Sequence, residues 1–163
     1  MTLSNEILNE HFIADFENGK LYRKSNGKEC VSLDMKHKYY RVSCENSSYA
    51  VHRILWQMKY GSLPKFIDHI NLNGLDNRIE NLRTCSHKEN NRNKKITSIN
   101  TLGFKGVWYE RNSCKYHSAI TVDYKKIHLK SCLTAKTAAV YYDFAAVKYH
   151  GDFAMTNKKL GLL

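Results

Sequence analysis

The feature that most limits the fold is the stretch 65–95, which is far richer in Asn, Asp and His than the segments on either side. These residue types favour turns, because their side-chain oxygens accept hydrogen bonds from nearby backbone N–H groups. We predict a short strand over 66–70, a turn-rich loop over 71–77 and a second short strand over 82–85. Gly74 is expected at the tightest point of the loop.

A helix is predicted to follow this hairpin. Ser86 and Glu89, three residues apart, have the pattern of a capping box, which predicts a helix beginning at His87. Asn90 then lies in the early turns of that helix, where it is expected to face back across the hairpin.

The part before the stretch predicts short strands and two helices. Ser4 is a candidate N-cap for a helix over 5–11, and Asn18-Gly19 is a strong turn signal. Strands are expected over 39–42 and 49–51. Apolar positions at helical spacing then predict a helix over 51–60, which Gly61 and Pro64 end.

The part after the stretch has the order strand, strand, strand, helix. The strands are expected over 104–109, 115–123 and 126–132. The helix is expected over 135–150, with Thr134 as its N-cap and Gly151 just past its end. We interpret one helical stripe as core packing. That stripe consists of Val140, Phe144 and Val147, with Ala138, Tyr141 and Ala145 beside it.

Composition predicts a folded cytoplasmic protein with polyanionic partners. The 163 residues are 42% hydrophobic and 25% charged, which suits one ordinary domain or two small ones. No apolar run approaches a membrane span, and the N-terminus lacks the layout of a secretory signal. Five widely spaced cysteines without a C-x-x-C pair predict reduced thiols and no structural zinc. The net charge of +11 favours nucleic acid, although a generally basic protein would show it too.

The predicted strand, loop, strand and helix bring three chemically useful side chains within reach of one point. Asp68 and the amide oxygen of Asn90 offer oxygen ligands for a hard divalent cation. His69 is suited to deprotonate an attacking water, and the Asn81 amide is suited to fix the orientation of its ring. The alternative is a hydrogen-bonded loop without catalysis. The residues expected to build that loop are Asn71, Asn73, Asp76 and Asn77.

The segment resembles the HNH motif of the ββα-metal endonucleases, in particular that of phage homing enzymes. The resemblance rests on His69, Asn81 twelve positions later and Asn90 twenty-one positions later. It implies that His69 is the general base, that Asp68 and Asn90 bind the metal and that Asn81 positions the base. The third position is often His, and His87 is the competing residue here. An amide oxygen at this position favours Mg²⁺, with Mn²⁺ as a second option, over zinc.

Residues 103–157 resemble the APETALA2-type DNA-binding domain of plant transcription factors. The resemblance rests on the segments 103–107, 126–129, 134–146 and 150–154. It implies a three-stranded sheet lying on one helix, with its free face in the major groove of DNA. The DNA-facing residues that it implies are Lys105, Trp108, Glu110, Thr121, Lys126 and His128. Trp108, Glu110 and Thr121 differ from the plant pattern, so the recognised sequence should differ, and the alternative is a solvated sheet face.

These inferences predict an α+β protein with a ββα-metal HNH nuclease domain followed by a three-stranded antiparallel sheet packed on one helix. The domains are 1–95, with an HNH core at 51–95, a linker at 96–102 and the DNA-binding domain at 103–157. The expected function is metal-dependent hydrolysis of double-stranded DNA, of the phage homing type, by a monomer or homodimer in the infected host cell, without membrane binding. A DNA-binding regulator without catalysis, or a partner-binding module, is the alternative. Further candidates for phosphate contact are Arg83, Lys88 and Arg92.

Overall fold

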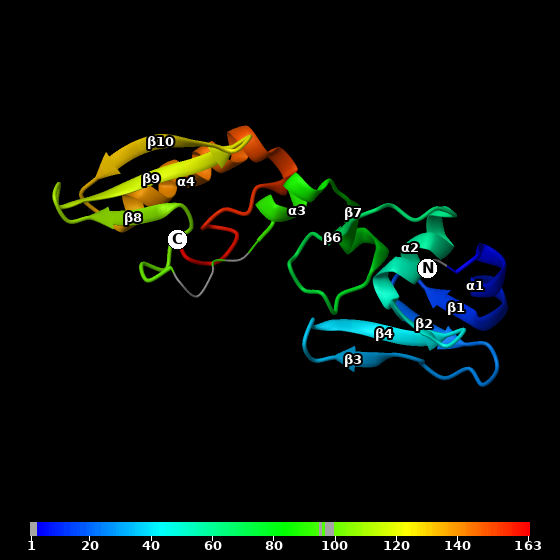
Figure 1. Ribbon diagram of the computed structural model, residues 1–163. Coiled ribbons are helices and arrows are strands. Elements are labelled where there is room, and N and C mark those ends of the chain that lie inside the picture. The colour runs from blue at the N-terminus through cyan, green and yellow to red at the C-terminus, as the bar shows by residue number, and fades with distance from the viewer. Residues whose placement is uncertain (1–2, 95, 97–99) are drawn as a thin grey trace. The chain divides into compact units, whose positions relative to one another are not determined.

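The computed structural model describes residues 3–94, 96 and 100–163 and shows an α+β protein built of antiparallel sheets and helices (Figure 1). The chain divides into two compact units, Met1–His87 and Lys88–Leu163. The predicted linker over 96–102 lies partly outside the described residues. The division between the units falls earlier in the chain, within α3 (His87–Arg92).

The first unit contains three small antiparallel sheets and two full helices. Its sheets have the strand orders β1-β2, β3-β4-β5 and β6-β7. The elements are α1 (Asn5–His11), β1 (Phe12–Asp15), β2 (Lys20–Arg23), β3 (Ser32–Asp34), β4 (Tyr39–Cys44), β5 (Ser47–Ala50), α2 (Val51–Tyr60), β6 (Ile67–His69), the 3-10 helix η1 (Ile79–Asn81) and β7 (Leu82–Thr84).

Local signals place the two helices as predicted. The Ser4 hydroxyl accepts a hydrogen bond from the Ile7 N–H and caps α1. Gly61, at a φ of 73°, ends α2, and its N–H donates to the Gln57 carbonyl. The two helices and β1, β2 and β4 enclose one hydrophobic core. That core consists of Leu3, Leu8, Phe12, Leu21, Val42, Cys44, Val51, Ile54 and Leu55.

The second unit is a three-stranded antiparallel sheet of order β10-β9-β8 with a helix packed on one face (Figure 1). The helix α4 is capped by the Thr134 hydroxyl, which accepts a hydrogen bond from the Thr137 N–H as predicted. The elements are β8 (Val107–Glu110), β9 (Lys115–Val122), β10 (Lys125–Cys132), α4 (Ala135–His150) and the 3-10 helix η2 (Gly151–Phe153). No described helix is long and apolar enough to cross a lipid bilayer.

The predicted core stripe of α4 is wrong, although Ala138 and Ala145 beside it are buried as predicted. Val140, Phe144 and Val147 are 40%, 73% and 59% exposed, and the helix buries a neighbouring face instead. Four alanines on the buried face let the helix lie close to the sheet. Its largest member, Tyr142, packs on Gly106, where an added Cβ would lie 2.0 Å from the ring. The buried face consists of Ala138, Ala139, Tyr142, Ala145 and Ala146.

Candidate active site

The hairpin of β6 and β7 carries the two central residues of the predicted site. Asp68 pairs with Arg83 across the hairpin, and His69 pairs with Leu82. Because consecutive strand residues point to opposite faces, the carboxylate and the imidazole leave the strand on different sides. Both side chains are buried, each with about 6% of its surface exposed. A buried carboxylate and a buried imidazole need polar partners, and the hairpin supplies them.

Asp68 is held by an ion pair within the hairpin. The Nε and Nη2 atoms of Arg83 donate to Oδ2 of Asp68 over 3.0 Å and 2.8 Å. The sequence assigned Arg83 to phosphate contact. The structure places its guanidinium on the candidate metal-binding carboxylate, whose negative charge it balances.

His69 is hydrogen bonded to Asn77 from the far end of the loop. The Nε2 atom of the ring lies 3.1 Å from Oδ1 of Asn77. Burial lowers the pKa of the His69 imidazole below its usual value, and the hydrogen bond to Asn77 and the charge of Asp68 offset part of this effect. The ring is therefore neutral at neutral pH, which is the state that a general base requires.

Two aromatic rings enclose His69. Tyr39, at the start of β4, stacks on it with the ring centres 5.7 Å apart, and His52 of α2 meets it edge-on at 5.0 Å. The rings of Tyr39 and His52 lie 5.2 Å apart. Burial, followed by the charges of His69 and nearby arginines, lowers the pKa of His52 to about 3, so this ring is neutral as well.

Two buried polar atoms beside His69 have no hydrogen-bond partner among the described residues. They are Nδ1 of His52 and Nδ2 of Asn77. Such atoms are rare in folded proteins, because each forfeits a hydrogen bond to water without replacing it. Their position beside the candidate base makes this place a candidate functional site.

The N-terminal sheets set the position of the loop. Gly19, at a φ of 65°, lets the β1–β2 turn approach so closely that an added Cβ would lie 2.4 Å from the Arg78 nitrogen. The Ile79 N–H donates to the Phe16 carbonyl of the same turn. On the other side Gly74 packs against Tyr39, where an added Cβ would lie 2.6 Å from the ring. Asn77 is thus held in place by contacts from residues far away in the chain.

The hydrogen bonds that the structure describes for Asn81 differ from the predicted ones. Its Nδ2 donates to the Asp76 carbonyl over 2.7 Å and to Oδ1 of Asn71 over 3.0 Å, and its Oδ1 accepts from the Asn71 N–H. Asn81 therefore braces the loop, and the described contact to the His69 ring comes from Asn77. The reason is that the loop folds back so far that its last residues reach the ring.

Three of the four predicted loop-builders, Asn71, Asn73 and Asp76, act as expected, whereas Asn77 contacts His69 instead. Oδ1 of Asn71 accepts a hydrogen bond from the Asn73 N–H, and its Nδ2 donates to Asp76 over 2.8 Å. Oδ1 of Asn73 accepts from the Leu75 N–H. Arg78 donates to Asp76 and lowers the pKa of that carboxyl to about 2. The loop is a network of Asx hydrogen bonds that carries His69 at one end and Asn77 at the other.

The third predicted site residue belongs to the other unit. Asn90 lies on α3, beyond the division between His87 and Lys88, so its pairing with Asp68 as a metal ligand stays a prediction. The competing residue, His87, is exposed at the start of α3, with its ring 5.8 Å from that of Phe66. The helix α3 starts at His87, as the capping box predicts. The hydrogen bonds of that box, between Ser86 and Glu89, stay a prediction.

The sheet face of the second unit that α4 leaves uncovered carries a cluster of rings and cations. Trp108 stacks on His117 at 5.4 Å and meets His128 edge-on at 6.1 Å. The Lys126 ammonium lies 4.1 Å above the Trp108 ring, a cation–π contact. Nδ1 of His117 lies 3.1 Å from Nε2 of His128. We call these four residues the ring cluster. Trp108, Lys126 and His128 were predicted to face DNA, and His117 is the additional member.

The other predicted DNA-facing residues occupy different surroundings. The Lys105 ammonium donates to the carbonyls of Arg92 and Lys94, and burial lowers its pKa to about 8. It thus supports the end of α3, and a DNA contact by Lys105 stays a prediction. Thr121 is exposed on β9, and Glu110 ends β8 opposite Lys115.

The contacts with His69 that the sequence did not predict come from Tyr39, His52 and Asn77. The neighbour of His52, Arg53, donates to the Pro64 and Lys65 carbonyls. Of these two residues, only His52 is described in contact with His69. The Val51-His52-Arg53 run at the start of α2 was the available signal for His52. Nothing local marks Tyr39, because its contact depends on the packing of two sheets.

Comparisons with known proteins agree with this geometry. A family model described as HNH endonuclease matches residues 49–92. Protein 3.8 of Escherichia phage T7 is 31% identical over 105 residues, which are 63% of this chain and 86% of the phage protein. An uncharacterized HNH endonuclease of Acanthamoeba polyphaga mimivirus, L560, is 30% identical over 122 residues, 73% of this chain and 63% of that protein.

A solved structure of the HNH homing endonuclease I-HmuI aligns with 86% of this chain and 85% of its own, at 18% identity and a TM-score of 0.44. That likeness is too weak to add support. The match to the family model carries the assignment. Residues 49–92 of this chain form an HNH endonuclease domain.

Proposed function

We propose that this protein is a metal-dependent endonuclease that hydrolyses phosphodiester bonds in double-stranded DNA, with His69 as the general base. The observation that carries the proposal is the state of His69. It is a buried, neutral imidazole, hydrogen bonded to Asn77 and next in sequence to a buried carboxylate, within the segment that the HNH family model matches.

The proposed role of Asn77 is to select the protonated nitrogen of the base. With Oδ1 of Asn77 as the acceptor, Nε2 of His69 carries the proton and donates it over 3.1 Å. Nδ1 is then the nitrogen that takes a proton from the attacking water. Tyr39 and His52 restrict the ring to one orientation, since each packs against it. A fixed, correctly protonated base is what proton transfer in a transition state needs.

The donor set fits a hard divalent cation. Asp68 offers a buried carboxylate, and Asn90 is the proposed second oxygen ligand. Mg²⁺ is the expected ion, and Mn²⁺ is the alternative. When bound, such an ion stabilises the charge that develops on phosphorus and on the leaving oxygen. Arg83, which balances the charge of Asp68, is then available to hold a phosphate oxygen, and Arg92 is a further candidate for this role.

The second unit is proposed to position the nuclease on DNA with the uncovered face of its sheet, in the manner of an APETALA2-like domain. Support comes from the ring cluster, in which a lysine and two histidines surround an indole. Cations on such a face attract phosphates, and the rings offer surface to bases and sugars. The remaining residues of the proposed interface are Lys105, Glu110 and Thr121.

The proposed biological setting is a phage homing enzyme acting in the cytoplasm of an infected bacterium, as a monomer or a homodimer. Support comes from the similarity to the phage T7 protein over most of that protein's length. With one candidate active site per chain, a monomer is expected to nick one strand, and a double-strand cut requires a second chain or a second binding event.

A second candidate function is DNA binding without cleavage. The observation in its favour is the ion pair of Asp68 with Arg83, which satisfies the carboxylate without a metal. Incubating the protein with phage-derived double-stranded DNA and Mg²⁺ or Mn²⁺, and sequencing the ends, separates the two functions. The nuclease proposal expects metal-dependent cuts with 5′-phosphate and 3′-hydroxyl ends. Tight, salt-dependent DNA binding without cuts in either metal would contradict it and support the regulator.

A further inference from the structure

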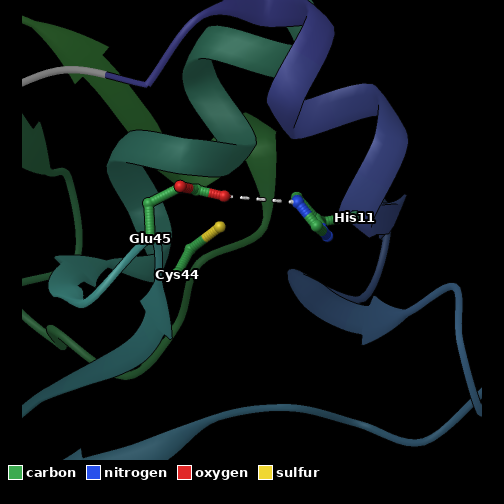
Figure 2. A group of neighbouring side chains, drawn as sticks. All are labelled: His11, Cys44 and Glu45. Carbon is green, nitrogen blue, oxygen red and sulfur yellow. Dashed lines mark ion pairs between the residues drawn. The ribbon is translucent and has the colours of Figure 1, made fainter.

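We propose that His11, Cys44 and Glu45 form a second metal site, separate from the nuclease site, for a thiophilic divalent cation such as Zn²⁺. The three ligand atoms, one from each side chain, lie within 4.8 Å of one another. Figure 2 shows the carboxylate of Glu45 joined to the His11 ring by an ion pair, which spans 3.7 Å, with the thiol of Cys44 beside them. The site is independent of the proposed cleavage reaction.

The backbone of two of the ligands is fixed by the main core of the first unit. His11 is the last residue of α1, and its carbonyl accepts a hydrogen bond from the Lys24 N–H over 3.0 Å. The next residue, Phe12, is buried in the same core cluster as Cys44. The thiol thus approaches the imidazole from a strand whose position is set by packing and by pairing with β5. The site is preorganised to this extent before any ion binds.

The third ligand, Glu45, is positioned by a left-handed backbone conformation. Neighbouring residues on a strand normally point to opposite faces, which would separate Glu45 from Cys44. Here Glu45 and Asn46 form a tight turn with φ values of 48° and 55°. Turns of this kind favour Asn, Asp and Gly, and a glutamate in the left-handed region is sterically strained. This conformation lets the carboxylate lie on the same side as the thiol.

The chemistry of the donors selects the class of metal. A thiolate and an imidazole are ligands of zinc and its relatives, whereas Mg²⁺ prefers oxygen ligands only. The thiolate and the carboxylate together carry two negative charges, which a divalent cation neutralises. This balance matters because the Arg23 guanidinium donates to the Ser43 carbonyl next door and would repel a cation held by neutral ligands.

Binding requires only a small adjustment. Metal–ligand bonds of about 2.0–2.3 Å in a tetrahedral site place ligand atoms about 3.5 Å apart. The side chains of His11 and Glu45 are 37% and 58% exposed, so they are free to rotate inward while the buried Cys44 stays in place. Water would fill the fourth position. The bound ion would tie the end of α1 to the β4–β5 turn and so stabilise the strand that begins with Tyr39.

The test is a titration of the full-length, chelator-treated protein with Co²⁺, a spectroscopic substitute for Zn²⁺. We expect one equivalent to produce the near-ultraviolet absorption of a cobalt–thiolate bond, and Zn²⁺ to displace it. Cys44→Ser should abolish this absorption, and the matched change Cys114→Ser, at an exposed cysteine of the second unit, should keep it. Asp68→Asn should keep it too, because the nuclease site contributes no thiolate.

Because Cys44 is buried, Cys44→Ser could lose the band by misfolding, so two variants at exposed ligands provide an independent test. Glu45→Gln and His11→Gln should bind Co²⁺ at least about tenfold more weakly than the wild type, with unchanged circular dichroism. Zn²⁺ should raise the melting temperature of the wild type more than that of either variant. The proposal is overturned if the wild type gives no thiolate band, if Cys44→Ser keeps the band, or if both surface variants bind Co²⁺ as tightly as the wild type.

Discussion

The nuclease loop and the ring cluster place their polar side chains in opposite ways. In the loop the base and its partner are almost wholly buried, with His69 6% and Asn77 2% exposed, and hydrogen bonds hold them. In the ring cluster Lys126 and His128 are exposed, and a cation–π contact and an edge-on contact with Trp108 order them. A general base needs a fixed position and a shifted pKa, whereas a DNA-contacting face needs access. The comparison predicts that loop variants lose cleavage while cluster variants lose affinity.

Apart from loss of the base itself, the largest effect on cleavage should follow removal of the proposed metal ligand. Asp68→Asn keeps the shape of the side chain but removes its charge, so we expect cleavage to fall by about 100-fold to 1000-fold. DNA affinity should stay within a few-fold of the wild type. Asp123→Asn, at an exposed carboxylate of the second unit, is the control and should cleave normally. Cleavage by Asp68→Asn at near the wild-type rate would remove Asp68 from the mechanism.

The next effect tests the hydrogen bond that orients the base. Asn77→Ala leaves Nε2 of His69 without its described partner, and we expect the maximal cleavage rate to fall by about 10-fold to 100-fold. Asn73→Ala, in the same loop but exposed, is the control and should change the rate only slightly. The rate should fall at saturating DNA with the dissociation constant unchanged. A change in affinity alone would show that Asn77 does not act through His69.

The ring cluster should show the reverse pattern. Lys126→Ala removes the cation above Trp108, and we expect weaker DNA binding with a salt dependence smaller by about one unit of slope. The cleavage rate at saturating DNA should be unchanged. Lys136→Ala, at an exposed lysine on α4, controls for the loss of one positive charge. Equal losses of affinity in both variants would show that Lys126 contributes only through its positive charge and makes no specific contact with DNA.

The last prediction concerns protein stability and separates a buried from an exposed histidine by pH. The pKa of His52 is about 3 in the folded protein against an ordinary value of 6.5, so between these pH values only the unfolded chain binds the proton. The free energy of unfolding should therefore fall as the pH falls from 6.5 to 3, by up to about 1.4 kcal/mol per pH unit. This part of the slope should vanish in His52→Gln. Urea denaturation at a series of pH values measures it.

His128→Gln, at an exposed position in the ring cluster, is the matched variant for this comparison. If His52→Gln and His128→Gln gave the same slope, the burial of His52 would not govern its titration.

Most helices and strands could be predicted because local chemistry determines them. Ser4, Gly61 and Thr134 mark helix ends through hydrogen bonds to residues within four positions. The face that α4 buries could not be predicted from hydrophobicity. The sheet accepts alanines and Tyr142 because Gly106 leaves room there, and Phe144 remains outside.

The site could be predicted in part for the same reason. Asp68 and His69 follow from a motif of fixed spacing. The contact of Asn77 with His69 depends on the course of a loop that Gly19, far away in the sequence, helps to position. The stacking of Tyr39 on His69 depends on the packing of separate sheets. Contacts between distant segments leave no periodic signal in the sequence, so only the fold reveals them.

The most direct test of the central proposal is the single-turnover cleavage rate of His69→Ala at saturating DNA with Mg²⁺, measured together with its dissociation constant for the same DNA. We predict that the rate falls by about 100-fold to 10,000-fold, because the general base is lost. The dissociation constant should stay within about threefold of the wild type, because the ring cluster is intact. Cleavage by His69→Ala at a rate close to that of the wild type would contradict the assignment of His69 as the catalytic base.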